Sequence, residues 1–516
     1  MRFGMVIAVV GSAVGLGNYL RFPGQMALYG GIAFMIPYFC ALVFLGLPLA
    51  LSEWTLGRYG GIRGHSSAPG IFRSVVKRRR IAYTGSLFVM MPVVIFSYYI
   101  LIEGWCLLYA IQFARGMMHL GTAEAYGASF ANLVGASQDG AVFQHIFTNQ
   151  TLLCIYFSFA LNFYLIYCGI NKGIQLFCTI ALPALLICSV IIFIRVATLG
   201  NPTGIPGQSF FDGLKFVCST AGSDKTILQQ LARPECWLAA AGQVFFSLSV
   251  GFGLVLTYAS YMNKDDEIAS PCVTAVASNS FIEIIFGGLM IVPAAIMFLG
   301  PTAINKETIG SPFALGFHTL PTVFEQMPLG QFFGFLFFVL LFLAAVTSSI
   351  SMLQPAIALF EDGLGLKKRG SVILLAIMMF FASMFVIWFS KDLVALDTFD
   401  FWIANIFVFL AATFQIILFG WGLGIDTGMS EMQRGSTLQI PWFMRYLIKY
   451  IAPLFLLIVF SAWCWLELPN RIRELGENRV AQLSVGAILL IEAFFLWVVS
   501  RAIKRWNEVE RQLENE

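Results

Sequence analysis

The sequence predicts an all-α membrane protein with twelve transmembrane helices in a single domain that covers residues 1–516. Only 11% of the residues are charged and 59% are hydrophobic, whereas a soluble globular protein carries about 25% charged residues. Apolar runs of about 20 residues, the length that crosses a bilayer as a helix, recur along the whole chain. Because backbone N–H and C=O groups must pair internally in hydrocarbon, such runs imply a bundle of helices.

Short connections join most of the predicted spans, and three longer ones lie on the outer side. The longer connections cover residues 115–149, 197–234 and 300–328, and none is large enough to form a separate catalytic domain. We therefore expect function to reside in the spans themselves. The spans are predicted at residues 3–28, 31–57, 81–113, 150–169, 173–196, 235–262, 269–300, 329–361, 370–390, 393–422, 447–467 and 479–501.

The basic residues indicate the orientation of the chain. With both termini inside, inner segments hold about twice as many Lys and Arg residues as outer segments, which is the bias of cytoplasmic loops. We predict a multi-pass protein of the cell inner (plasma) membrane with cytoplasmic N and C termini. The run from Lys77 to Arg80 fits a loop beside lipid headgroups better than a nucleic-acid patch. The bilayer is thus the expected partner, and nucleic acid is not.

Cysteine and histidine positions argue against an enzyme. Eight of the ten cysteines lie in apolar spans, where cysteine acts as a small hydrophobe. Cys218 and Cys236 share an outer loop, and the sequence leaves open whether they pair. The four histidines are scattered over loops without the spacing of metal ligands or catalytic groups. The first apolar stretch continues as a membrane helix, so we expect no cleaved signal peptide.

Two spans share a glycine-interrupted pattern. AVGLG at residues 13–17 in the first span matches SVGFG at residues 249–253 in the sixth. Spans that are five apart cross the membrane in opposite directions. Matched interruptions in two halves are typical of an inverted repeat with its binding site near the midplane. We expect a 5+5 inverted repeat with broken helices 1 and 6, in which residues 1–197 and 234–424 are the repeats and residues 445–505 form two extra helices.

The glycines make local unwinding of a helix inexpensive. Glycine costs about 1 kcal/mol relative to alanine in a helix and accepts positive φ, so Gly15 and Gly17 favour a break. The freed amides and carbonyls must face a cavity, an ion or a substrate, and amides at a helix start suit a carboxylate. The alternative is close helix packing by small residues. Two matched breaks beside polar residues favour a binding site.

These residues resemble the neurotransmitter:sodium symporters, and specifically their bacterial leucine-transporter-like branch. The resemblance implies the leucine-transporter fold and sodium-coupled transport, and it covers nearly all of the first ten spans. The motifs that carry it, in family order, are AVGLGNYLRFP (13–23), EWTLGRYGG (53–61), SYYILIEGW (97–105), GQVFFSLSVGFG (242–253), TYASY (257–261), AAVTSSISMLQP (344–355) and DFW (400–402).

The resemblance implies two sodium sites made of oxygen ligands, which suit a hard cation. Without the resemblance, a Thr-Ser-Ser run in a span would be interpreted as hydroxyls that bond back to their own helix. The first site would use the Ala13 carbonyl, the side chains of Asn18, Ser247 and Asn279, and the carboxylate of the substrate. The second would use the carbonyls of Gly11, Val14 and Ala344 and the hydroxyls of Thr347 and Ser348.

The resemblance also implies an amino-acid substrate. The family's amine transporters carry an aspartate where this chain has Gly15, and that aspartate stands in for a substrate carboxylate. The implied pocket contains no charged side chain, so we expect a neutral, hydrophobic amino acid. The alternative is ordinary packing, and Met352 is adaptable enough to blur any size prediction. The implied contacts are Ala13, Leu16, Gly17, Tyr99, Phe246 and Ser249 for the charged groups, with Ile95, Tyr99, Phe246, Phe252, Ser348 and Met352 around the side chain.

Charged residues in the spans match the family's gates. Arg21 would pair with Asp400 above Tyr99 and Phe246, with Gln243 close by; the alternative for Arg21 is an interfacial arginine that reaches toward water. Glu283 lies one turn after Asn279 and would replace the chloride ion of chloride-dependent members, beside Tyr38, Gln243 and Ser247. We therefore expect chloride independence.

The inner side departs from the family pattern. Asp362 and Tyr261 match the family's cytoplasmic gate, whereas Arg2 lies several positions too late to match its N-terminal arginine. Either the start of the chain lies upstream, or inner closure works differently. Gly173 and Pro183 keep the family spacing of a segment thought to unwind on the inner side, although an ordinary kink has the same signature.

The sequence thus predicts a sodium-coupled amino-acid symporter that works by alternating access. One alternative is a transporter-like receptor without turnover, which the missing inner arginine supports. Another is a proton-coupled exchanger, against which Thr347 and Ser348 argue. A homodimer is one assembly that the sequence leaves open.

Overall fold

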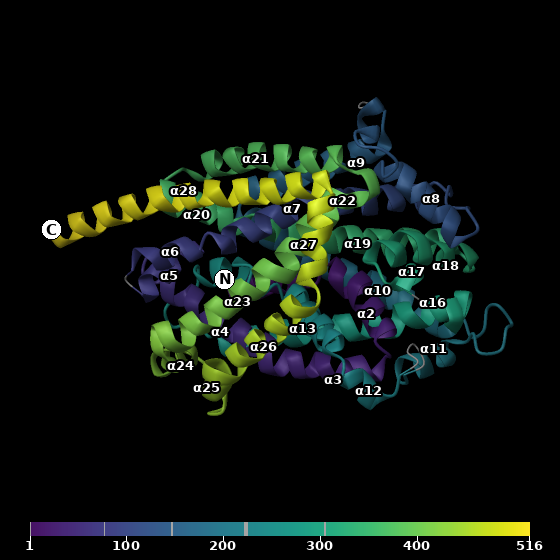
Figure 1. The fold of residues 1–516 in the computed structure, drawn as a ribbon, viewed down its shortest axis with the longest axis horizontal. Helices are drawn as coiled ribbons and strands as arrows, with labels where there is room; N and C mark the ends of the chain where they lie inside the picture. The colour runs from purple at the N-terminus through teal and green to yellow at the C-terminus, as the bar shows by residue number, and fades with distance from the viewer. Residues whose placement is uncertain (1, 77, 146–147, 221–224, 304–305, 516) are drawn as a thin grey trace.

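The computed structural model describes residues 2–76, 78–145, 148–220, 225–303 and 306–515, and every regular element in these ranges is helical (Figure 1). Within these ranges, ten helices are long and apolar enough to cross a membrane. All ten coincide with predicted spans. They cover Ile32–Gly61, Arg79–Ala114, Gln150–Cys168, Lys172–Thr198, Ala269–Leu299, Gly330–Leu364, Lys368–Trp388, Lys391–Gln433, Met444–Leu466 and Arg479–Glu508.

The remaining two predicted spans, the first and the sixth, are interrupted. The first is split into α1 (Arg2–Ala13), the π-helical turn η1 (Gly17–Arg21) and α2 (Phe22–Leu28). The sixth is split into α13 (Pro234–Leu248) and α14 (Leu254–Ala259). Both interruptions fall where the sequence predicts them. No piece is long enough to cross a bilayer without its partner.

The long helices are assembled from segments that π-helical turns or proline bends separate. From the second span to the eighth they are α3 (Ile32–Ala41), α4 (Leu47–Gly61), α6 (Arg79–Thr84), α7 (Leu87–Ala114), α9 (Gln150–Cys168), α10 (Leu176–Thr198), α15 (Ala269–Ile282), η5 (Glu283–Ile291), α16 (Val292–Leu299), α19 (Gly330–Met352) and α20 (Gln354–Leu364). They continue with α21 (Lys368–Trp388), α22 (Val394–Trp402), α23 (Val408–Ile417), α24 (Ile425–Gln433), α25 (Met444–Tyr446), α26 (Ala452–Leu466) and α28 (Arg479–Asn515).

The connections carry short helices of their own, which the sequence did not predict. They are α5 (Ala68–Val75), α8 (Ala123–Val134), α11 (Phe210–Val217), α12 (Ile227–Leu231), α17 (Lys306–Ile309), α18 (Leu320–Gln326) and α27 (Leu468–Glu477). Two of the longer connections are joined at Glu325 of α18, whose carboxylate accepts hydrogen bonds from the backbone N–H groups of Leu120 and Gly121 and from the Tyr126 hydroxyl. Burial and this carboxylate raise the pKa of Tyr126. All ten cysteines are free, so Cys218, which is exposed, and Cys236, which is buried, do not pair.

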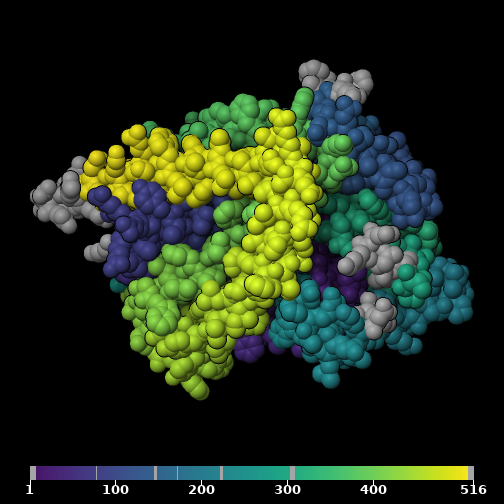
Figure 2. Space-filling view, in the orientation of Figure 1, coloured from purple at the N-terminus to yellow at the C-terminus, as the bar shows by residue number. Residues whose placement is uncertain are grey.

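Burial separates central helices from peripheral ones. The most apolar stretch of the α6–α7 span is 94% buried, whereas the corresponding stretches of the α10 and α28 spans are 28% buried. α7 therefore forms the axis of the bundle, and α10 and α28 present apolar side chains outward. Figure 2 shows α26 to α28 lying across one face of the molecule, and in Figure 1 the C-terminal part of α28 extends past the bundle. The helix thus continues beyond the predicted end at residue 501.

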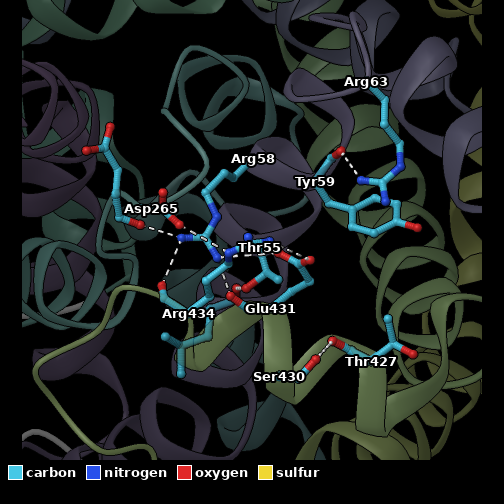
Figure 3. A network of polar contacts seen from close by, with 11 residues as sticks. Thr55, Arg58, Tyr59, Arg63, Asp265, Thr427, Ser430, Glu431 and Arg434 are labelled. Atoms are coloured by element: carbon cyan, nitrogen blue, oxygen red, sulfur yellow. Dashed lines mark hydrogen bonds and ion pairs between the residues drawn. The ribbon is translucent and has the colours of Figure 1, made fainter.

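A buried arginine connects three parts of the bundle (Figure 3). Arg58, in the last turn of α4, is fully buried, and its guanidinium donates to the backbone carbonyls of Asp266, Glu431 and Arg434. Its Nη2 atom also lies 3.7 Å from the Glu431 carboxylate. The predicted second span ends at residue 57 and would leave Arg58 in a loop, which is wrong: α4 continues to Gly61, and Arg58 is an internal brace between α4, the connection after α14 and the end of α24.

Replacing Arg58 by Met keeps much of the side-chain volume but leaves these carbonyls without a donor. Removing one partner of a buried charged network costs about 3–5 kcal/mol, so we expect a marked fall in the melting temperature of the purified protein. Arg63→Met is the control, because the exposed Arg63 only stacks on Tyr59 and bonds its carbonyl. Equal melting temperatures for the two variants would contradict the bracing role of Arg58.

Candidate functional site

The first break is closed by its own asparagine. After α1 ends at Ala13, the backbone N–H of Gly15 donates to Asn18 Oδ1 over 3.1 Å, and the N–H of Asn18 donates to the Gly15 carbonyl over 3.2 Å. A side chain at Gly15 would be crowded: a Cβ atom there would lie 2.8 Å from Ser348 Oγ and 3.4 Å from the Tyr99 hydroxyl. Any larger residue at position 15 therefore requires the Ser348 hydroxyl to move.

The second break is a left-handed turn held by a buried carboxylate. Ser249, Gly251 and Gly253 have φ values of 52°, 81° and 78°. The fully buried Glu53 of α4 accepts hydrogen bonds from the N–H groups of Gly251 (3.2 Å) and Gly253 (3.3 Å). Glu53 thus satisfies amides that unwinding has freed. No role was predicted from the sequence for Glu53, which lies in the motif EWTLGRYGG. A lone carboxylate in an apolar span is nevertheless a sign of a functional or structural site.

The predicted first sodium set is brought together between the two breaks. Asn18 Nδ2 donates to Asn279 Oδ1 over 2.8 Å, and Asn279 Nδ2 donates to Ser247 Oγ over 2.5 Å. All three side chains are buried. Ala13, whose carbonyl completes the predicted set, is the last residue of α1. The three side chains come from the first, sixth and seventh spans, so they connect both halves of the chain.

Glu283 extends this polar chain. Its carboxylate accepts from the Tyr38 hydroxyl and from Gln243 Nε2, each over 2.5 Å, and Gln243 Nε2 also lies 3.4 Å from the Gly17 carbonyl. Glu283 is fully buried and forms no ion pair among the residues that the structure describes. The predicted chloride-substituting carboxylate therefore lies next to the predicted first sodium set.

The predicted second sodium set lies where α1 packs against α19. Ser348 Oγ lies 3.1 Å from both the Ser12 carbonyl and the Ala344 carbonyl, either of which can accept its proton, and Thr347 Oγ1 lies 3.1 Å from the Ala344 carbonyl. Both hydroxyls are buried. They bond back to their own helix, as the simpler interpretation predicts, and Ser348 also reaches α1. The predicted sodium ligands Gly11, in α1, and Val14, just after it, flank Ser12, whose carbonyl is the one that Ser348 contacts.

A cavity of about 380 Å³ lies beside the first break. Leu16, Gly17, Tyr99 and Phe246 line it. The N–H of Leu16 lies 3.5 Å from the Tyr99 hydroxyl, and the rings of Phe246 and Phe252 meet edge to face at 6.1 Å. Of the other predicted pocket residues, Ile95 is buried and Met352 and Ser249 are half-buried, and none of the three lines this cavity.

The two predicted outer gate residues line the same cavity without touching. The Arg21 guanidinium lies 5.0 Å from the Phe246 ring centre, and the Asp400 carboxylate accepts from the Tyr98 hydroxyl over 2.7 Å. Across the described ranges no ion pair joins Arg21 to Asp400. Tyr98, the immediate neighbour of the predicted Tyr99, is the gate contact that sequence reasoning missed.

A second cavity, of about 510 Å³, opens where α14 and α20 end. Tyr261, Glu361, Lys172 and Lys368 line it, and Tyr261 is 41% exposed. No hydrogen bond joins Tyr261 to Asp362 in the part of the chain that the structure describes. The two predicted inner gate residues are therefore not joined to each other in this conformation, and their role in a gate stays a prediction.

Asp362 instead bonds the C-terminal helix and the connection after α4. Trp506 Nε1 donates to Asp362 Oδ1 over 3.0 Å and to its carbonyl over 3.2 Å, and Ser67 Oγ donates to Asp362 Oδ2 over 3.0 Å. His65 Nδ1 lies 3.5 Å from Asp362 Oδ1 and packs its ring edge-on against Trp506. Nothing in the sequence placed Trp506 in contact with the eighth span.

A family model of the sodium:neurotransmitter symporters matches residues 1–123 and 142–490. The chain belongs to this family. An uncharacterised sodium-dependent transporter of Methanocaldococcus jannaschii is 26% identical over 515 residues and covers 98% of both chains. An uncharacterised sodium-dependent transporter of Bacillus subtilis is 28% identical over 476 residues and covers 89% of this chain and 96% of its own.

The solved structures agree with the family. The crystal structure of MhsT in complex with L-phenylalanine is similar with a TM-score of 0.74 and 27% identity, and it covers 89% of this chain and 98% of its own. This symporter therefore has the leucine-transporter fold and lies in the bacterial branch that the sequence predicts. It is a sodium-dependent, multi-pass membrane transporter and not an enzyme.

The sterics at the first break yield a matched pair of variants. In Gly15→Ala the new methyl group displaces the Ser348 hydroxyl from the Ser12 carbonyl, whereas in Gly17→Ala it meets Phe246 Cδ1 at 3.6 Å, an ordinary contact. We expect Gly15→Ala to weaken the apparent sodium affinity about tenfold, equivalent to ~1.4 kcal/mol, with little change for Gly17→Ala. Thermal shift of the purified protein in a sodium titration measures both. An equal loss in the two variants would contradict the steric account.

Proposed function

We propose that this symporter carries a neutral, hydrophobic amino acid together with sodium by alternating access. The observation that carries the proposal is the meeting of two unwound segments around a buried chain of neutral polar side chains, Asn18, Asn279 and Ser247. Unwound backbone inside a membrane protein is stable only where its polar groups find partners. A sodium ion and an amino acid can both supply partners for these freed backbone groups.

Two sodium ions are the proposed coupling ions. Neutral carbonyl, amide and hydroxyl oxygens dominate both residue sets, which favours a hard monovalent cation. In this proposal the carboxylate of the substrate supplies a further ligand to the first ion. If that carboxylate completes the coordination, sodium and substrate each bind more tightly in the presence of the other. This linkage is the proposed origin of coupling.

The substrate assignment rests on what the pocket lacks. A side chain at Gly15 would have to displace the Ser348 hydroxyl, and the cavity offers the amides of Leu16 and Gly17 beside the Tyr99 hydroxyl. These donors suit a carboxylate that the ligand brings itself. Phe246 lines the cavity and would supply apolar surface for its side chain, with Phe252 packed edge to face behind it. MhsT, which was solved in complex with L-phenylalanine, supports an amino acid of this class.

Chloride independence follows from the position of Glu283. A carboxylate already lies beside Ser247 and Gln243, so a bound chloride would add a second negative charge at short range. We propose that Glu283 supplies the negative charge that balances the first sodium ion. The neighbouring Tyr38 hydroxyl holds the carboxylate in place.

We also propose how the chain crosses the membrane. We assign twelve crossings, with the interrupted first and sixth spans counted as one each, and a 5+5 inverted repeat with two extra helices. The distribution of Lys and Arg residues supports cytoplasmic termini. The cavity that Arg21 and Asp400 share is then extracellular, and their approach would close it over the substrate. On the inner side, Asp362 would be held by Trp506 of α28.

Ligand-induced thermal stabilisation of the purified protein tests the function directly. The standard amino acids are each screened in sodium chloride, sodium gluconate and potassium chloride. We expect hydrophobic amino acids, with L-phenylalanine as the first probe, to raise the melting temperature more in sodium than in potassium. A concentration of 100 Kd stabilises the protein by about 2.7 kcal/mol.

The chloride and gluconate series should coincide, because Glu283 takes the place of the anion. Asn18→Ala is expected to abolish the difference between sodium and potassium. Equal shifts in sodium and potassium for every amino acid would contradict the proposal. An unchanged sodium dependence in Asn18→Ala would remove Asn18 from the first site.

The inner contact yields a separate prediction. Trp506→Phe keeps an aromatic ring beside His65 but removes the N–H group that donates a hydrogen bond to Asp362. A hydrogen bond to a charged group contributes about 1.5–3 kcal/mol, so we expect about tenfold faster hydrogen exchange in α20 by mass spectrometry. Trp497→Phe, at a position of α28 that is 52% exposed, is the control. Exchange at the same rate in both variants would exclude a role for Trp506 in holding α20.

A further inference from the structure

A carboxyl group outside both proposed sodium sets lies at the junction of three spans. Glu103 of α7 is fully buried, and it contacts Asn162 of α9 and Ser349 of α19. These three helices pack directly against one another. No ion pair to Glu103 is present among the described residues. A buried carboxylate without a cation is costly in a membrane protein. The protonation state of Glu103 therefore needs an explanation.

The contacts around Glu103 form a closed ring. Asn162 Nδ2 donates to Glu103 Oε1 over 2.8 Å and to the Ser158 carbonyl over 2.9 Å. Ser349 Oγ lies 2.8 Å from Glu103 Oε2 and 2.7 Å from Asn162 Oδ1. It also lies 3.1 Å from the carbonyl of Val346 in its own helix.

An ionised Glu103 leaves this ring one proton short. The Ser349 hydroxyl has a single proton, yet Glu103 Oε2 and Asn162 Oδ1 both lie at hydrogen-bond distance and both are acceptors. Reversing the Asn162 amide does not help, because its oxygen would then face Glu103 Oε1 and the Ser158 carbonyl. In either orientation two acceptors meet with no proton between them.

A proton on the carboxyl group completes the ring. Glu103 Oε2–H then donates to Ser349 Oγ, the Ser349 hydroxyl donates to Asn162 Oδ1, and Asn162 Nδ2 donates to Glu103 Oε1. Each short contact has one donor and one acceptor. We infer that Glu103 is a proton-binding site that stays protonated in the working transporter and, in this neutral form, positions α19.

No charged group nearby favours the ionised form. On α9 and α19 the groups that face the carboxyl are the neutral Ser158, Asn162 and Ser349. On α7 itself the titratable neighbours are Tyr99 and Cys106, neither of which supplies a positive charge. α21, which also packs on α7, has its basic residues Lys368 and Arg369 only in its first turn.

The ring connects to the proposed second sodium site, and this step rests on the proposed function. Ser349 directly follows Thr347 and Ser348, whose hydroxyls lie at the contact between α19 and α1. The ring fixes the rotation of α19 from its far side, so that the Ser348 hydroxyl points at the Ser12 carbonyl. Glu103 is therefore a positioning residue for sodium, and it acts through Ser349.

Two substitutions separate the protonated form from the ionised form. Glu103→Gln reproduces the protonated pattern, because its amide N–H donates to Ser349 and its oxygen accepts from Asn162. We expect an apparent sodium affinity within about twofold of the native value by thermal shift. Glu103→Met has a similar size but no hydrogen bonds, and we expect a loss of about tenfold, as for Ser349→Ala, which opens the same ring.

Infrared spectroscopy tests the proton itself. The native-minus-Glu103→Gln difference spectrum of the purified protein at neutral pH should contain the C=O band of a protonated carboxylic acid. A carboxylate band in its place would overturn the inference, as would a Glu103→Gln variant that fails to fold or loses sodium affinity like Glu103→Met. The infrared result does not depend on sodium binding. If sodium failed to stabilise the native protein, the proposed function would be refuted, but the assignment of the proton to Glu103 would still hold.

Discussion

The requirement that backbone polar groups be satisfied inside a membrane governs this structure. Two spans are interrupted where they meet, and each interruption frees amides and carbonyls that hydrocarbon cannot hydrate. At the second break the Glu53 carboxylate takes the N–H groups of Gly251 and Gly253. At the first break Asn18 takes the N–H of Gly15, and Ser348 reaches the Ser12 carbonyl from α19. At the first break the groups that stabilise the unwound backbone, Asn18 and Ser348, are thus also members of the proposed sodium sets.

Buried carboxyl groups recur around these sites, and each has a different set of partners. Glu53 accepts from backbone amides, Glu283 from Tyr38 and Gln243, and Glu103 from Asn162. We expect Glu283 to balance an ion and Glu103 to carry a proton. The difference arises from hydrogen-bond geometry, because all three are fully buried. Identical side chains therefore serve separate roles according to the donors that face them.

Much of the fold could be predicted from the sequence, because hydrophobic length and glycine spacing are local signals. The ten long helices fall on predicted spans, and the two breaks fall at AVGLG and SVGFG. The missed features depend on partners far away in the chain. Trp506 and Asp362 are separated by 144 positions in the sequence, and Arg58 donates to carbonyls more than 200 positions away. No local sequence pattern could therefore predict either contact. Arg21 and Asp400 line the same cavity without an ion pair between them in the described ranges, so their pairing as a gate stays a prediction.

Uptake into proteoliposomes tests the central claim, that occupation of the two breaks by sodium and an amino acid drives transport. The labelled substrate is the amino acid that stabilises the purified protein best in sodium. The account predicts accumulation above the external concentration under an inward sodium gradient, and loss of accumulation when a sodium ionophore collapses that gradient. Binding without accumulation would indicate a receptor, and accumulation driven by a pH gradient in the absence of sodium would indicate a proton-coupled exchanger. Either result would contradict the account.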